Sequence, residues 1–101
     1  MTRILRLDGY VLDSLMRDLV GHDQQPSAFL LYLCLWNRAS GGRVRKVRLS
    51  LRELAIESGL SKRAVQNAVR HLGARRLVRA ERAHRTAVPV YELLRPWRRR
   101  R

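Results

Sequence analysis

The chain has 101 residues, a formal net charge of +14 and 46% hydrophobic residues. This length suits one domain, and the apolar content is sufficient for a compact core and too high for a disordered tail. The single cysteine, Cys34, excludes an intrachain disulfide and a cysteine-rich zinc site, and it is expected to be a small core residue.

The positive charge is concentrated after Asn37. The first 37 residues hold three arginines and four aspartates, so the rest of the chain carries all of the excess. Such a surface attracts polyanions, because phosphate contacts release condensed counterions. No amphipathic basic helix suggests a membrane surface, and no apolar stretch approaches the roughly 18 residues of a membrane span. No secretory segment is evident, so we expect a cytoplasmic protein.

The first 25 residues are predicted to form an arm and an amphipathic helix. Residues 1–7 alternate basic and apolar side chains and fit either a short strand or an ordered arm. From Tyr10 to Val20 the apolar residues follow the helical period, Asp8 is available as a cap, and Gly21 ends the segment. This helix must bury its apolar stripe against another surface.

The next segment is predicted to be the central helix of the core. Pro26 suits the first helical position, and residues 27–39 are apolar on nearly every side. Tyr32 and Trp36 lie on one face; core packing is favoured over stacking on nucleic-acid bases, since no basic residue interleaves with them. Ser40 and two glycines end the helix, and residues 43–49 suggest a short strand.

Two helices joined by a tight turn are predicted from Ser50 to Leu77. Ser50 and Glu53 have the spacing of a capping box, Gly59 suits the left-handed end of the first helix, and Ser61 caps the second. The inward stripe of the second helix consists of Ala64, Val65, Ala68, Val69 and Leu72.

The opposite face of that second helix carries Lys62, Arg63, Gln66, Asn67 and Arg70. A polar stripe is often only a solvated surface. Here it has three positive and no negative charges, and arginine, glutamine and asparagine suit bidentate hydrogen bonds to base edges in a DNA major groove. We therefore predict contact with nucleic acid.

After Leu77 the apolar period changes from 3.6 to 2, which predicts a β-hairpin. Val78 and Ala80 belong to its first strand, residues 83–86 to its tip and residues 87–93 to its return. Pro89 lacks a backbone donor, so an outward-facing edge position is expected for it. Residues 95–101 form a basic tail that is expected to stay extended unless a polyanion is present, with Trp97 as an anchor on the domain.

From Ser50 to Val78 the chain resembles the winged helix-turn-helix domain of bacterial transcriptional regulators, including the MarR-like group and similar modules of plasmid replication initiators. The resemblance rests on Leu-Arg-Glu-Leu-Ala, Ser-Gly-Leu-Ser-Lys-Arg-Ala-Val-Gln-Asn-Ala-Val-Arg-His-Leu and Arg-Leu-Val, and extends more weakly over residues 26–94. It implies an α+β, mainly α fold with a three-helix core, a small antiparallel wing and an extra N-terminal helix. Arg76 departs from the pattern, since many relatives have glycine there.

The resemblance also suggests site residues. Base readout is expected from Arg63, Gln66, Asn67 and Arg70. Phosphate contacts are expected from Ser61, Lys62, Arg52, Arg48 and Arg79. The wing would add Arg82, His84 and Arg85, and the tail Arg98, Arg99, Arg100 and Arg101. An extra terminal helix in such regulators often pairs with its copy, which suggests a homodimer through Val11, Leu12, Leu15, Met16 and Leu19; the alternative is packing on its own domain.

These features predict a sequence-specific, double-stranded DNA-binding protein that acts as a dimeric transcriptional regulator. The alternatives are a plasmid or phage replication or partition module, and a winged scaffold that binds protein or RNA. No nucleophile motif, phosphate-binding glycine loop or paired carboxylates indicate an enzyme. No cofactor or metal site is predicted, because the three histidines are scattered without a carboxylate at ligand spacing. An effector ligand, the target sequence and the direction of regulation are not indicated.

Overall fold

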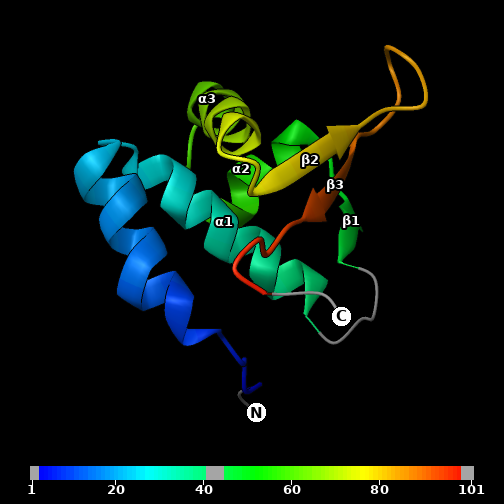
Figure 1. The fold of residues 1–101 in the computed structure, drawn as a ribbon. Helices are drawn as coiled ribbons and strands as arrows, with labels where there is room; N and C mark the ends of the chain where they lie inside the picture. Colours follow the sequence, from blue (N-terminus) through cyan, green and yellow to red (C-terminus); the bar gives the residue numbers. More distant parts are fainter. Residues whose placement is uncertain (1–2, 41–44, 99–101) are drawn as a thin grey trace.

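The structure is a computed structural model that describes residues 3–40 and 45–98 and has an α+β fold (Figure 1). Its elements follow the order η1 (Val11–Leu15), η2 (Arg17–His22), α1 (Pro26–Ala39), β1 (Lys46–Arg48), α2 (Leu51–Ser58), α3 (Lys62–Ala74), β2 (Val78–Glu81) and β3 (Val90–Leu93). Among the described residues, no helix is long and apolar enough to cross a membrane.

Helix α1 is the centre of the molecule, as its apolar sequence predicts. Leu31, Tyr32 and Leu35 are fully buried, and the helix packs against α2, α3, η2 and the sheet strands β1 and β3. Cys34 packs at the edge of this core, where burial raises the pKa of its thiol. The expected central helix is confirmed, and Cys34 is only partly buried, against the core rather than within it.

The three strands form an antiparallel sheet in the order β1-β3-β2. Tyr91 of the central strand β3 faces Val47 of β1 and Ala80 of β2. The expected edge position of Pro89 is wrong: this residue is buried and precedes the central strand, and its carbonyl accepts a hydrogen bond from the Leu49 N–H at 3.3 Å. Because strand pairing begins at Val90, the missing N–H of proline lies outside the ladder.

The N-terminal helix forms as predicted, but with π-type winding. The Met16 N–H bonds to the Val11 carbonyl and the Asp23 N–H to the Asp18 carbonyl, each five residues back. This wider winding aligns Val11, Leu15 and Leu19 on one face. Figure 1 shows the two η helices running antiparallel to α1, and η2 packs against it.

The apolar stripe of this helix is buried in the protein's own core. Val11 and Leu19 are 0% exposed and Leu15 is 5% exposed, so these three residues are not available at a dimer interface, and that prediction is corrected for them. The alternative, packing on the same domain, holds for this stripe. Leu12 and Met16 of the predicted interface remain 49% and 42% exposed.

An aromatic stack joins Tyr10, near the start of the N-terminal helix, to Trp97 of the C-terminal segment. The Trp97 ring stacks on Tyr10, with 4.6 Å between centroids, and on Trp36, at 6.4 Å. Trp97 Nε1 donates to Asp8 Oδ2 at 2.9 Å, and Trp36 Nε1 donates to the Arg6 carbonyl at 2.7 Å. Trp97 therefore anchors the C-terminal segment as predicted, and the buried Tyr32 and Trp36 serve as core residues rather than as a base-stacking pair.

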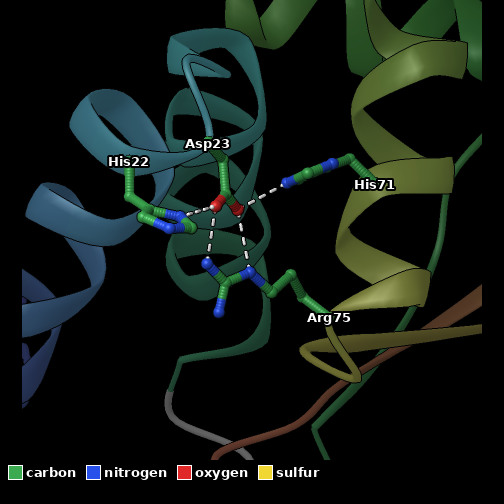
Figure 2. A network of polar contacts seen from close by, with 4 residues as sticks. All are labelled: His22, Asp23, His71 and Arg75. Atoms are coloured by element: carbon green, nitrogen blue, oxygen red, sulfur yellow. Dashed lines mark hydrogen bonds and ion pairs between the residues drawn. The ribbon is translucent and has the colours of Figure 1, made fainter.

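Asp23 ties the end of α3 to the turn between η2 and α1 (Figure 2). Its side chain is only 7% exposed and accepts two hydrogen bonds from Arg75, at 2.8 and 2.6 Å. It also bonds to His71 Nε2 at 2.7 Å and to His22 Nδ1 at 2.8 Å. These contacts, with Arg75 first, hold the pKa of Asp23 well below its usual value. Two of the three histidines that the sequence leaves without a carboxylate at ligand spacing, His22 and His71, thus share one carboxylate.

Candidate nucleic-acid interface

The two helices and their connecting turn are specified by local contacts. The Ser50 hydroxyl accepts from the Glu53 N–H at 3.0 Å, and the Glu53 carboxylate accepts from the Ser50 N–H at 2.8 Å, which completes the predicted capping box. Gly59 ends α2 with a φ of 77°, and the Ser61 hydroxyl caps α3 by accepting from the Ala64 N–H at 3.1 Å. The predicted caps and turn are confirmed.

Helix α3 has one buried and one open face. Val65, Ala68 and Leu72 are at most 1% exposed and pack in the core. On the other side the five predicted side chains are all exposed and, with Leu51, line a shallow groove of about 570 Å³: Lys62, Arg63, Gln66, Asn67 and Arg70. We call this surface the α3 groove. Its placement agrees with the predicted division of the helix into an inward and an outward face.

The positive charge of the α3 groove is not compensated by nearby acids. Among residues 3–40 and 45–98, no carboxylate forms an ion pair with Lys62, Arg63 or Arg70. Arg70 Nη1 instead donates to Asn67 Oδ1 at 3.1 Å, which orders two groove side chains relative to each other. The groove therefore presents three free cations and two amides to an incoming ligand, a set suited to base edges and phosphates.

The β2–β3 hairpin borders the α3 groove. A second hollow, of about 330 Å³, lies between α3 and the sheet, where Gln66 and Arg70 face Arg82 and Tyr91. Figure 1 shows the connection between β2 and β3 projecting away from the body of the molecule. Within this connection the Arg82 guanidinium donates to the Arg85 carbonyl at 3.1 Å, and Thr86 bonds to the His84 ring at 3.2 Å. Arg82, His84 and Arg85 are all exposed there.

The predicted phosphate-binding residues differ in their availability. Lys62, Arg52 and Arg48 are exposed. The Ser61 hydroxyl is engaged as the α3 cap. Arg79 pairs with Glu92 at 2.9 Å across the β2–β3 ladder, so part of its charge is already satisfied.

The predicted basic tail is not extended at Arg98. Arg98 pairs with Asp8, with Nε 2.7 Å from Oδ2, and this pairing lowers the pKa of the Asp8 carboxyl. The description of Arg98 as an extended tail residue is therefore corrected. Arg99, Arg100 and Arg101 lie outside the described residues. The partner, Asp8, was predicted as a helix cap, and no local signal in the sequence indicates that it contacts residues about 90 positions away.

Comparison of the chain with protein-family models, with curated protein sequences and with solved structures finds no match.

Proposed function

We propose that this protein is a sequence-specific, double-stranded DNA-binding protein of the winged helix-turn-helix type, acting in the cytoplasm as a dimeric transcriptional regulator. The observation that carries the proposal is the α3 groove: a polar, positively charged helix face, uncompensated by acids among the described residues, backed by a buried apolar stripe and bordered by an arginine-bearing hairpin.

The proposed role of each residue in DNA binding follows from its place on α3, beside α3 or in the β2–β3 hairpin. Arg63, Gln66, Asn67 and Arg70 would read base edges in the major groove, because their side chains offer the donors and acceptors that distinguish base pairs there. Lys62, Arg52 and Arg48 would contact phosphates and set the orientation of the helix. The β2–β3 hairpin would act as the wing, with Arg82 and Arg85 entering a flanking minor groove or contacting the backbone.

The dimer would use the exposed residues of the N-terminal helix. Leu12, Met16 and Val20 are spaced four residues apart and are 49%, 42% and 39% exposed, so they form an apolar strip on the outside of η1 and η2. Pairing of this strip with its copy would bury it and would place two α3 helices on successive half-sites of a palindrome.

The proposal is tested by selecting the fragments that the protein binds from a random duplex library. The affinity for the selected duplex and for a scrambled duplex is then measured over a range of salt concentrations. A palindromic consensus with stronger binding to the selected duplex is the expected result. Repeated, non-palindromic sites would indicate the replication or partition module instead. Equal affinity for both duplexes would reject sequence-specific readout and favour a scaffold that binds protein or RNA.

A further inference from the structure

A second basic surface lies away from the α3 groove. It is a cavity of about 1030 Å³ beside the N-terminal arm, and five arginines line it together with one aspartate: Arg3, Arg6, Arg45, Arg95, Arg98 and Asp8. We call it the arm cavity. Figure 1 shows the N-terminal arm and the C-terminal segment near the Ala39 end of α1, whereas α3 lies towards the other end. The arm cavity and the α3 groove share no lining residue.

The charge of the arm cavity is unbalanced. Asp8 is engaged by Arg98, which leaves the other four arginines without an ion-pair partner among the residues that the structure describes. A concave surface with several charges of one sign concentrates counterions, because low-dielectric walls focus the field. The arm cavity therefore favours an anion with more than one negative charge.

Two of these arginines are held in an unfavourable setting. Arg45 Nε and Arg95 Nη1 are buried and have no hydrogen-bond partner among the described residues. Burial and the neighbouring charge of Arg45 both lower the pKa of Arg95. Buried donors without acceptors are disfavoured, as are two like charges side by side. An oxyanion in the cavity that both arginines line would supply the missing acceptors and offset the like charges.

The side chains around Arg95 favour a ligand that is recognised through its phosphate groups rather than through an aromatic base. The Arg95 guanidinium lies 5.7 Å from the centroid of the Trp36 ring, which positions it by a cation–π contact. Trp36 is also stacked on Trp97, and it is only 3% exposed. Because Trp36 is almost completely buried, it offers no open ring surface for a nucleobase. Arginine pairs, by contrast, match the bidentate geometry of phosphate oxygens.

We propose that the arm cavity is an oxyanion-binding site in which Arg45 and Arg95 bind phosphate groups of a small polyphosphorylated ligand. This inference does not depend on the proposed function of the α3 groove.

The test is calorimetric titration of the full chain with inorganic tripolyphosphate at low ionic strength. Two double variants with the same net charge are compared: Arg45→Gln with Arg95→Gln, and Arg63→Gln with Arg70→Gln. We expect the first pair to weaken tripolyphosphate binding at least about tenfold, and the second pair to weaken it less than about twofold. No binding by the natural chain, or equal losses in the two variants, would overturn the proposal, because equal losses report only net charge.

A second measurement needs no variant and so does not depend on variant folding. In nuclear magnetic resonance spectra of the natural chain, tripolyphosphate should shift the side-chain N–H signals of Arg45 and Arg95 before those of Arg63 and Arg70. The reverse order would overturn the proposal.

A 20-base-pair duplex distinguishes the sources of phosphate. If the Arg45 and Arg95 variant loses tripolyphosphate binding and keeps duplex binding, the ligand is a small molecule. If this variant loses tripolyphosphate binding and duplex binding to the same degree, the arm cavity binds the phosphates of a nucleic-acid backbone, and the assignment to a small ligand is wrong. Failure of the DNA proposal appears separately, as an unchanged duplex affinity in the Arg63 and Arg70 variant.

Discussion

The Arg75 guanidinium donates two hydrogen bonds to the Asp23 carboxylate, from Nε to Oδ2 at 2.8 Å and from Nη2 to Oδ1 at 2.6 Å. Arg75 directly follows α3, and Asp23 precedes α1. Together with the contact to His71, the contact between Arg75 and Asp23 holds the C-terminal end of α3 against the turn before α1 (Figure 2). It therefore connects a charge in the N-terminal third of the chain to the position of the α3 groove.

Replacing Asp23 by asparagine should destabilise the protein. The neutral amide leaves Arg75 and His71 without their anion. Because the Asp23 side chain is 7% exposed but Arg75 is 38% exposed, the loss is smaller than for a fully buried ion pair, and we expect about 1 to 3 kcal/mol. Urea unfolding measures the change in the free energy of unfolding. Asp13→Asn, which removes an exposed aspartate, is the matched control. Equal effects of the two substitutions would show that the cluster contributes no stability.

Stability should decrease in acid. The folded protein lowers the pKa of Asp8 and Asp23, so their ion pairs contribute stability that is fully present above the unfolded aspartate pKa of about 3.9 and is lost as pH falls towards the folded values. Urea midpoints should therefore decline between about pH 5 and pH 2. The decline should be shallower in Asp23→Asn, and an identical slope would contradict the assignment.

Trp97→Ala should loosen the contact between the two chain ends. The substitution removes the ring that stacks on Tyr10 and Trp36, and because Trp97 is half-buried we expect a loss of about 2 kcal/mol. Trp97→Phe keeps a stacking ring but lacks the donor to Asp8, so it should lose about 1 kcal/mol. In thermal unfolding, the natural chain should have the highest melting temperature, Trp97→Phe an intermediate one and Trp97→Ala the lowest. Any other order argues against the aromatic stack as the anchor of the C-terminal segment.

Arg76→Gly should stabilise the protein. Arg76 follows α3 with a φ of 59°, a left-handed conformation that costs a side-chain-bearing residue about 1 to 2 kcal/mol. Glycine relieves this strain but loses more chain entropy on folding, so the expected gain is about 0.5 to 1 kcal/mol. Arg76→Ala keeps the strain and should show no gain. A destabilised Arg76→Gly would mean that the arginine side chain contributes more than the strain costs.

Arg63→Ala should weaken binding to the selected duplex by about 1 to 3 kcal/mol and relax the preference at one base pair. The physical reason is the loss of a bidentate donor on the open face of α3. Competition binding with single-base variants of the selected duplex measures both effects. Arg17→Ala removes the same charge from the exposed side of η2 and should change affinity little. Equal losses on selected and scrambled duplexes would exclude Arg63 from base readout.

The sequence alone determined the features that depend on near neighbours in the chain. The Ser50 and Glu53 capping box, the left-handed Gly59 and the Ser61 cap all arise within a few residues, so their spacing was sufficient to predict them. The inward and outward faces of α3 were predictable for the same reason, because helical periodicity assigns each side chain to a face.

Only the tertiary structure decided the long-range partnerships. Asp23 meets Arg75 across 52 positions and Asp8 meets Arg98 across 90, and no spacing rule connects residues so far apart. Helical periodicity showed that the N-terminal helix had an apolar stripe to bury. Whether Val11, Leu15 and Leu19 met a second subunit or the protein's own core depended on which surface lay beside them. The missing N–H of Pro89 suggested an edge position, but the tertiary structure places Pro89 directly before the central strand β3, where pairing has not yet begun.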